Sequence, residues 1–298
     1  MEVGSLFCGA GGFDLGFINK GHKISWAIDN DKDCIETYKA NIGTEAILAD
    51  VKNVDFKSLS SADLIIGGFP CQGFSMANSH RHGGDERNLL YREFVRAVDE
   101  QKPKFFLAEN VRGILSLDKG EAIKTIVKDF SNVGFDVEYR VFNAKFFGVP
   151  QSRVRVLIWG VRKDVVVERN WIAEDKNRPL ISVGEALVDI PEPDTAHHLK
   201  NHVGSKYKIT NRNFIGCRTT DPGKPSPTII ARGNGKGGVN AIQHPNNHRR
   251  MTVRECALIQ TFPIDFEFYG SMSSAYRQIG NAVPVKFAEA IAQKFKGL

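Results

Sequence analysis

The residues Phe7-Cys8-Gly9-Ala10-Gly11-Gly12 decide the fold, because they join a candidate strand at residues 3–7 to a helical pattern at residues 13–20. A glycine-rich turn at this point lets the backbone approach a ligand closely, and the helix that follows offers free N–H groups to an anion such as a carboxylate. A tight turn without a ligand would use the same residues. The stretch therefore predicts the first strand–turn–helix unit of an α/β sheet.

Outward from this turn, short β-branched or aromatic runs alternate with helical patterns as far as about residue 164. In Lys23-Ile24-Ser25-Trp26-Ala27-Ile28 the large apolar residues fall on alternate positions, and Leu64-Ile65-Ile66 is typical of a strand buried on both faces. This order predicts an α/β fold with a doubly wound parallel sheet. The candidate strands are residues 3–7, 23–28, 46–48, 63–66, 104–107, 137–142 and 154–160, and the helical stretches are residues 13–20, 32–40, 89–101 and 120–132.

The rest of the chain is organised differently. A segment spaced by Pro179, Pro191 and Pro193 leads into a glycine-rich stretch, and two helical patterns follow at residues 252–260 and 285–296. At about 150 residues per domain, the 298 residues indicate two domains. The proportions of 42% apolar and 25% charged residues are ordinary, which excludes a disordered or fibrous chain.

Positive charge is concentrated in residues 195–250, here called the basic segment. It contains ten lysines and arginines against one acid, Asp221, and so carries a net charge of +9, whereas the whole chain carries +6 and the remainder −3. Five of the eight histidines and seven glycines also lie in it, without regular hydrophobic periods. We interpret it as a loop-rich module. Its composition fits a solvated basic surface as well as a face that contacts the phosphates of a nucleic acid.

The sequence carries no sign of export or membrane insertion. Residues 1–5 include an acid where a signal peptide needs basic residues, and no apolar run approaches the roughly 18 residues of a membrane span. The five cysteines are odd in number and include no C-x-x-C pair, which argues against a zinc site or a disulfide framework. We expect a cytoplasmic protein with reduced thiols and no bound metal.

Carboxylates follow the second and third candidate strands, at the sheet edge where this class of fold binds ligands. Asp29 stands twenty residues after Gly9, where a carboxylate can accept from ribose hydroxyls, and Asp50 could accept a hydrogen bond from an adenine amino group. Asp14 occupies the position at which a dinucleotide fingerprint has its last glycine. The turn is therefore better suited to a single adenosyl group than to a pyrophosphate.

The fourth candidate strand ends in the turn Gly67-Gly68-Phe69-Pro70-Cys71-Gln72-Gly73-Phe74-Ser75. A cysteine after a rigid proline at the sheet edge is held exposed, near N–H donors that can lower the thiol pKa. A buried structural cysteine is the usual alternative. Here the polar, glycine-containing residues 76–87 that follow suit a loop closing over a substrate. Cys71 is therefore a candidate nucleophile.

Two further motifs place charge at the same edge. Glu109 follows the apolar run Phe105-Phe106-Leu107, so we expect its carboxyl group to be partly desolvated, as a general acid needs. Arg153 and Arg155 begin the last candidate strand, and the two-residue period sends both side chains to one side. Inside a buried sheet they need anionic or polar partners, whereas on a solvated edge strand they would lie in water.

Six motifs taken together resemble one family, the DNA (cytosine-5)-methyltransferases, in residue types and in order. The resemblance covers nearly the whole chain except the basic segment, which in that family is the variable target-recognition region. The motifs are Phe7-x-Gly9-x-Gly11-Gly12, Pro70-Cys71-Gln72, Glu109-Asn110-Val111, Gln151-x-Arg153-x-Arg155, Arg254-Glu255-Cys256 and Gln278-x-Gly280-Asn281-Ala282-Val283-Pro284.

The resemblance implies transfer of a methyl group from S-adenosyl-L-methionine to carbon 5 of a cytosine in duplex DNA. It implies a Rossmann-like catalytic domain at residues 1–170, completed by residues 272–298, and a smaller, loop-rich target-recognition domain with a hinge at residues 171–271. It also implies a covalent Cys71 adduct at carbon 6 of a flipped-out base. In this scheme Glu109 contacts N3 and the amino group, Arg155 contacts O2, and Arg153 supports the same pocket.

Further residues take roles through the resemblance alone. Position 29 is Asp where the family usually has Glu, which shortens the reach to the ribose. The cofactor-binding set is Phe7, Gly9, Gly11, Gly12, Asp29, Asp50, Pro70, Asn281 and Val283. The DNA-binding set is Gln72, Ser75, Arg87, Thr228, Arg232 and Lys236. Because few residues precede the first candidate strand, we expect a stand-alone prokaryotic enzyme, acting as a monomer and paired in function with a restriction endonuclease.

Three other functions fit parts of the sequence. A tRNA (cytosine-5)-methyltransferase would share the fold, although the basic, glycine-rich segment favours DNA. A nicotinamide-dependent oxidoreductase would use the same sheet, but it leaves Cys71 and Glu109 without a role. A catalytically silent DNA-binding protein would use only the basic segment.

Overall fold

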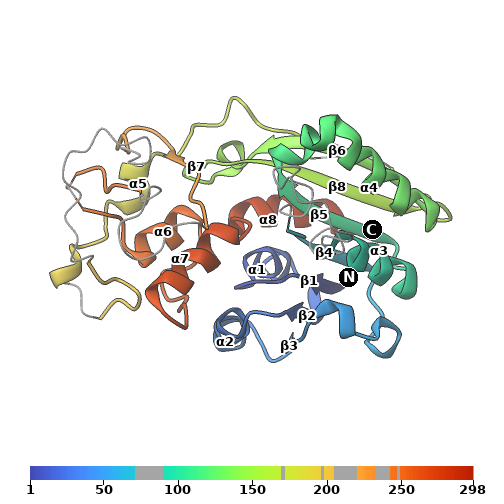
Figure 1. The fold of residues 1–298 in the computed structure, drawn as a ribbon. Helices are drawn as coiled ribbons and strands as arrows, with labels where there is room; N and C mark the ends of the chain where they lie inside the picture. The colour runs from blue at the N-terminus through green and yellow to red at the C-terminus, as the bar shows by residue number, and fades with distance from the viewer. Residues whose placement is uncertain are drawn as a thin grey trace.

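The computed structural model describes residues 1–70, 90–168, 172–195, 198–204, 220–231, 242–246 and 249–297. Within these residues, seven strands form one sheet in the order β3-β2-β1-β4-β5-β8-β6 (Figure 1). The strands are β1 (Glu2–Leu6), β2 (Lys23–Asp29), β3 (Ala46–Leu48), β4 (Leu64–Gly67), β5 (Phe105–Val111), β6 (Phe135–Asn143) and β8 (Val154–Arg162), and β7 (Gln151–Ser152) pairs separately with β9 (Ser226–Pro227). This is the doubly wound α/β fold that the sequence predicts.

Strand β8 corrects one feature of the prediction, because the sheet is not wholly parallel. β1 pairs in parallel with β2 and β4, and β4 with β5, but β8 runs antiparallel to both of its neighbours, β5 and β6. Only ten residues separate Asn143 at the end of β6 from Val154 at the start of β8. A parallel connection needs a crossover of about a dozen residues or more, so β8 folds back beside β6.

Strand β5 extends further than its apolar run predicts. The prediction ends at residue 107, whereas β5 continues to Val111, with Glu109 paired opposite Leu157 of β8. Polar residues are rare inside a buried strand, so the apolar pattern alone stops too early. The consequence is that Glu109 is held by sheet hydrogen bonds rather than by a loop.

Helices cover both faces of the sheet. On one face α1 (Gly12–Ile18), α2 (Lys32–Asn41) and α8 (Val285–Ala292) bury apolar residues, among them Phe17, Tyr38 and Phe287. On the other face α3 (Leu90–Gln101) and α4 (Glu121–Asn132) contribute Phe94 and Phe130, whose ring centroids lie 5.8 Å apart. The sheet is thus buried on both sides, as the continuous apolar run in β4 predicts.

A third apolar cluster lies outside the sheet. It joins α5 (Val183–Leu187), α6 (Val253–Ile259) and α7 (Met272–Asn281), with Ile229 and Ile242 packed among them. α6 confirms the helix predicted at residues 252–260, and the helix predicted at 285–296 is α8, followed from Gln293 by a 3-10 turn. α5 and α7 are not predicted from the sequence. Gly280 lies in the last turn of α7, and glycine weakens a helical pattern.

Two kinds of feature are absent from the described part of the chain. None of its helices combines the length and the apolar character needed to cross a bilayer. Nor do its His, Cys, Asp and Glu side chains form a group of three or more that could hold a metal ion.

The C-terminal helix α8 packs against α1, the first helix of the chain (Figure 1). Gly16 of α1 faces Ala288 of α8 so closely that a Cβ at position 16 would lie 2.3 Å from the Cβ of Ala288. The same Cβ would lie 2.8 Å from the carbonyl carbon of Ala288, which cannot rotate away. Because α8 packs on α1, residues 281–284, which precede α8, lie next to the turn that follows β1.

We expect Gly16→Ala to lower the free energy of unfolding by about 1–3 kcal/mol, because the added methyl group forces α8 away from α1. Urea unfolding followed by circular dichroism measures this. Gly113→Ala is the control, since a Cβ there meets only a Val111 methyl group at 4.0 Å. Its effect should stay within about 0.5 kcal/mol. Equal effects of the two substitutions would contradict the close helix contact.

Candidate active site

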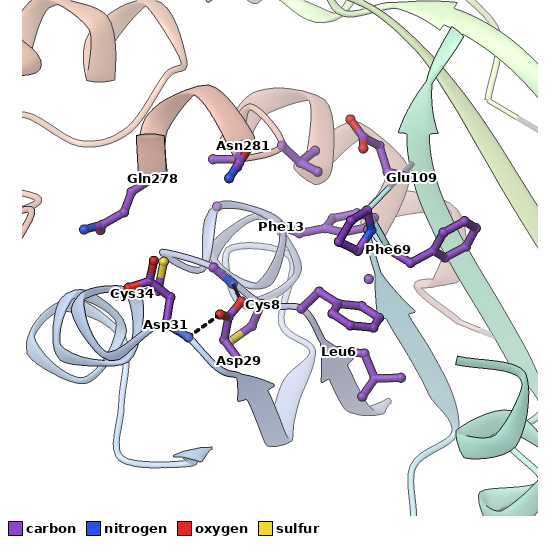
Figure 2. Close-up of a pocket in the computed structure, with 18 of the residues that line it drawn as sticks. Leu6, Cys8, Phe13, Asp29, Asp31, Cys34, Phe69, Glu109, Gln278 and Asn281 are labelled. Carbon is purple, nitrogen blue, oxygen red and sulfur yellow. Dashed lines mark hydrogen bonds between the residues drawn. The ribbon is translucent and has the colours of Figure 1, made fainter. Parts of the chain in front are cut away.

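A pocket of about 680 Å³ lies at the carboxyl ends of β1, β2, β4 and β5. Its walls come from both ends of the chain, because residues 5–9, Gly12 and Phe13 line it together with Arg277, Gln278 and residues 280–283. In Figure 2, Asp29, Glu109 and Asn281 surround the same space from three different elements. This is the edge of the sheet at which the sequence predicts ligand binding.

The turn after β1 takes its shape from Phe7 and Gly9, whose φ angles are +55° and +54°. The Gly9 N–H donates to Asp29 Oδ2 at 2.9 Å, and the Asp31 N–H donates to Asp29 Oδ1 at 2.9 Å. Burial raises the pKa of the Asp29 carboxyl group, while these backbone N–H groups act in the opposite direction. Asp29 therefore shapes the turn as well as lining the pocket.

The glycines of the turn do not all face the pocket. Gly9 and Gly12 line it, and a Cβ on Gly12 would lie 2.6 Å from the carbonyl oxygen of Val283. Gly11 faces α2 instead, because a Cβ there would lie 2.2 Å from the Ile42 side chain and 2.8 Å from Tyr38. Gly11 is absent from the described lining of the pocket, and its place is set by a positive φ of +83° and by helix packing. Its predicted contact with a cofactor stays a prediction.

Asp31, Asp50 and Arg277 are charged residues that also line the pocket. Asp50 lines the pocket and accepts the Lys52 N–H at 3.0 Å, which caps a short 3-10 helix. Asp31 caps α2, and its Oδ2 pairs with the guanidinium group of Arg277 at 2.9 Å. Asp31 and Arg277 both line the pocket, although the sequence motifs assign them no role there. Their pair links α2 to α7 across residues that are far apart in sequence.

Glu109 and Arg155 form an ion pair at the inner end of the pocket. Arg155 Nε lies 2.7 Å from Glu109 Oε1, and the two side chains are only 10% and 9% exposed. The predicted desolvation of Glu109 is thus confirmed, and Arg155 offsets the electrostatic cost of its burial. Gly68 lies beside them, because a Cβ there would be 3.6 Å from Glu109 Oε2. The carboxylate therefore stands next to the chain that leads to Pro70.

Asn110 holds the chain immediately before the candidate nucleophile. Its Nδ2 donates to the carbonyl oxygen of Phe69 at 3.0 Å, and its side chain is buried. Phe69 and Pro70 both line the pocket. The contact of Pro70 with a cofactor stays a prediction. Cys71 follows directly in the sequence but lies outside the described residues. In the sequence, Asn110 stands between Glu109 and Val111 in one of the six motifs. That position alone does not predict a separate role for it.

Arg153 and Arg155 both line the pocket but have different partners. Arg153 donates through NH1 to the Ile229 carbonyl and through NH2 to the Gly280 and Ala282 carbonyls, each at 3.0 Å. Burial lowers the pKa of Arg153 to about 9, and the neighbouring Arg155 acts in the same direction. The expectation of polar or anionic partners is confirmed. Arg153 positions backbone, while Arg155 presents its charge beside Glu109.

Asn281 and Val283, which the resemblance assigns to the cofactor, line the pocket together with Gln278, Ile230 and Ala231. The last two belong to the basic segment, for which the sequence predicts a role in DNA recognition alone. The Thr228 hydroxyl donates to the Ser152 carbonyl at 2.7 Å. This hydrogen bond connects the residue after β9 to β7. The other predicted DNA-binding residues, Gln72, Ser75, Arg87, Arg232 and Lys236, lie outside the described residues.

Comparison with known proteins decides the family. A family model described as C-5 cytosine-specific DNA methylase matches residues 1–219 and 213–297. The chain belongs to this family. The resemblance inferred from the six motifs is thereby confirmed, and the protein is a DNA (cytosine-5)-methyltransferase.

Individual relatives of this methyltransferase match it over nearly its full length. The Type II methyltransferase M.NgoFVII of Neisseria gonorrhoeae is 37% identical over 99% of this chain and 87% of the relative. M.MthTI of Methanothermobacter thermautotrophicus is 35% identical over 99% and 97%. A solved prophage-encoded DNA modification methyltransferase of E. coli has a TM-score of 0.78 at 25% identity, over 100% and 99%. The S. pombe Dnmt2 methyltransferase, with a TM-score of 0.73 at 19% identity over 99% and 97%, shares the fold.

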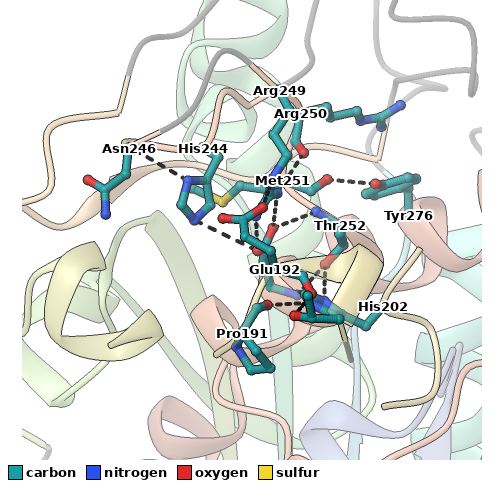
Figure 3. A network of polar contacts seen from close by, with 12 residues as sticks. Pro191, Glu192, His202, His244, Asn246, Arg249, Arg250, Met251, Thr252 and Tyr276 are labelled. Carbon is teal, nitrogen blue, oxygen red and sulfur yellow. Dashed lines mark hydrogen bonds and ion pairs between the residues drawn. The ribbon is translucent and has the colours of Figure 1, made fainter. Parts of the chain in front are cut away.

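In this methyltransferase, a buried carboxylate, that of Glu255, secures the chain around the basic segment. Figure 3 shows its partners Arg249 and Thr252. Glu255 accepts hydrogen bonds from the Arg249 guanidinium group at 2.9 and 2.8 Å and from the Thr252 N–H at 2.7 Å. Arg249 also donates to Glu192 at 2.9 Å. The motif Arg254-Glu255-Cys256 is absent from the described lining of the pocket. Through Arg249, Glu255 instead joins the start of α6 to Glu192.

Asp14 of the methyltransferase is a buried carboxyl group behind the glycine turn. Burial raises its pKa to about 7, the Glu45 carboxylate adds to the rise, and the Ser5 hydroxyl opposes it. An unfolded Asp titrates near pH 4. Between about pH 4 and pH 7 the folded enzyme therefore holds a proton that the unfolded chain has released. Stability falls as the pH rises through this window, and the loss is complete above it.

Asp14→Asn should stabilise the enzyme more at pH 8 than at pH 5, because Asn cannot acquire the buried charge. The gain should grow by about 2–3 kcal/mol between the two pH values, because only the roughly two pH units between pH 5 and the pKa of about 7 contribute, at about 1.4 kcal/mol per unit. Urea unfolding at both pH values tests this. Asp189→Asn, at an exposed carboxylate, is the control. A pH-independent effect of Asp14→Asn would show that Asp14 is already ionised at pH 5.

Proposed function

We propose that this enzyme methylates carbon 5 of one cytosine within a short, specific duplex DNA sequence, through a covalent Cys71 adduct at carbon 6 of a flipped-out base. The observation that carries the proposal is the Glu109–Arg155 pair, buried in the pocket and adjacent to the Pro70 that precedes Cys71. A carboxyl group and a guanidinium group together can bind N3, the amino group and O2 of a cytosine. Base flipping costs a few kcal/mol and exposes that edge.

The pocket suits the adenosyl part of S-adenosyl-L-methionine. Phe7 offers an aromatic face, and Asp50 offers a carboxylate oxygen for an adenine amino group. Asp29 already accepts two backbone N–H groups, but each carboxylate oxygen can accept a second hydrogen bond, from a ribose hydroxyl. Pro70, Asn281 and Val283 would complete the walls. When bound, this group supplies the methyl group for transfer.

The chain's own residues would carry the remaining steps. The Cys71 thiolate adds to carbon 6, and the electrons of the C5–C6 double bond make carbon 5 nucleophilic. Glu109 stabilises the charge that develops at N3, and Arg155 does so at O2. After carbon 5 receives the methyl group, a base removes its proton, the double bond reforms and Cys71 leaves as thiolate. Arg153 supports this pocket by positioning backbone.

Recognition of DNA is assigned to residues 171–271, with the catalytic part formed by residues 1–170 and 272–298. The net charge of +9 in the basic segment supports this assignment. Arg87, Arg232 and Lys236 would contact phosphates, and Gln72, Ser75 and Thr228 would lie near the flipped base. We infer a monomeric, cytoplasmic enzyme of a prokaryote that protects DNA from a partner restriction endonuclease, since its relatives are named Type II methyltransferases.

Bisulfite sequencing of DNA from cells that express the protein tests the activity and identifies the target together. Wild-type protein should leave 5-methylcytosine at one short sequence. Cys71→Ser should abolish the methylation, because a hydroxyl is a poor nucleophile at neutral pH, while calorimetric binding of S-adenosyl-L-homocysteine should remain within about threefold of wild type. Methylation by Cys71→Ser would exclude the covalent mechanism, and methylation of tRNA in place of DNA would exclude the substrate.

The affinity for duplex DNA should depend steeply on salt, because each phosphate contact releases a counterion. We expect the association constant to fall more than about tenfold between 50 and 200 mM NaCl, measured by fluorescence anisotropy. Lys236→Ala should reduce the slope of log K against log salt by about one. Lys124→Ala is the control, since Lys124 is an exposed residue on α4 paired with Glu121. An unchanged slope for Lys236→Ala would remove Lys236 from the DNA interface.

A further inference from the structure

The peptide unit of Ile229, just after β9, is held on both sides by two buried side chains, those of Gln151 in β7 and of Arg153 between β7 and β8. Gln151 Oε1 accepts the Ile229 N–H at 2.9 Å, and Arg153 NH1 donates to the Ile229 carbonyl at 3.0 Å. Gln151 and Arg153 are 0% and 1% exposed, so water does not compete for these bonds. The segment that leads into the glycine-rich part of the basic segment is thus tied to the residues before β8.

The same side chains also reach the wall of the pocket formed by residues 279–283. Arg153 NH2 donates to the carbonyls of Gly280 and Ala282, each at 3.0 Å. Gln151 Nε2 donates to Gln260 Oε1 at 2.8 Å, and Gln260 Nε2 donates to the Ile279 carbonyl at 2.7 Å. Gln260 also donates to Ala282 at 3.2 Å and is 0% exposed. Gln260 therefore connects the side chain that holds Ile229 to the wall.

The two backbone segments touch each other directly at Gly280. A Cβ on Gly280 would lie 2.3 Å from the Ala231 nitrogen and 2.5 Å from the Ile230 carbonyl carbon. Ile230 and Ala231 line the pocket together with Gly280 and Ala282. Neither segment can shift without breaking hydrogen bonds in the cluster of Gln151, Arg153 and Gln260. The position of residues 229–231 and the shape of this wall are therefore set together.

We propose that Gln260 is a positioning residue that couples the binding of DNA to the binding of the cofactor. The inference rests on the proposed function, in which residues 232–236 contact DNA and residues 281–283 contact the cofactor. DNA bound next to residues 229–231 favours one position of that segment, and Gln260 transmits this position to residues 279–282. Thermodynamic linkage requires the effect to be reciprocal, so cofactor must tighten DNA binding by the same factor.

The test is the affinity for S-adenosyl-L-homocysteine, measured by calorimetry with and without a 30-base-pair duplex that carries the bisulfite-identified target. We expect the duplex to tighten binding about tenfold in the wild type, within the usual range of coupling. In Gln260→Met, which keeps the length but removes both polar groups, the factor should fall below about twofold. Binding without DNA should change less than about threefold. At saturating duplex, the KM for S-adenosyl-L-methionine should rise about tenfold while kcat stays within about threefold.

Two further variants keep the test decisive. Gln101→Met on α3 is the matched control, because Gln101 also joins backbone groups, accepting from the Ala62 N–H and donating to the Phe56 carbonyl, but lies away from the pocket. It should retain the tenfold factor. Gln151→Met cuts the same connection from the other side and should reproduce the loss, also if Gln260→Met fails to fold.

The outcomes separate the two proposals. Tenfold coupling retained in both Gln260→Met and Gln151→Met, or no coupling in the wild type, would overturn the role of Gln260 while leaving the methyl transfer intact. A wild-type protein that binds S-adenosyl-L-homocysteine but methylates no DNA would overturn the proposed function itself.

Discussion

The shape of the site depends on one buried cation, the guanidinium group of Arg153. Burial of an unpaired charge costs several kcal/mol. A charged side chain is therefore buried only where other groups form hydrogen bonds or ion pairs with it. Here three carbonyl oxygens, of Ile229, Gly280 and Ala282, accept its N–H groups at 3.0 Å. They belong to segments far apart in the sequence, so satisfying one charge draws the end of α7 and the segment after β9 against the same sheet edge.

This arrangement also explains why two arginines, two residues apart, serve different ends. Arg153 makes three hydrogen bonds to backbone carbonyls through NH1 and NH2, and its Nε has no hydrogen-bond partner among the described residues. Arg155 instead lies 2.7 Å from Glu109, and the pair is 10% and 9% exposed at the pocket. Because this ion pair is partly open to the pocket, a polar ligand can hydrogen-bond to both groups. Those contacts replace part of the attraction between the carboxylate and the guanidinium group. One arginine thus fixes the walls and the other offers chemistry within them.

Most of the sheet could be predicted because its strands have local signatures. The apolar alternation in residues 23–28 and the short run at residues 46–48 depend only on neighbours in sequence, and β3 occupies the predicted residues. Features set by distant contacts could not be predicted in the same way. β8 is antiparallel because a short connection folds it beside β6, and α7 forms in spite of Gly280 because its apolar side packs in the third cluster.

The glycine motif shows why ligand contacts are harder to predict than elements. A Cβ at Gly9 would meet no other described atom within 4 Å, whereas Gly11 is confined by Tyr38 and Ile42, and Gly12 by the Val283 carbonyl. The three are equivalent in sequence, and only the docking of α2 and of residues 282–283 separates them. Residues 282–283 reach the turn only when α8 packs on α1. The pocket therefore forms only when the two ends of the chain are packed together, which is here called the closed arrangement. Stability of that helix contact and affinity for a ligand in the pocket are therefore linked: a bound ligand favours the closed arrangement by the free energy of its contacts with residues 281–283.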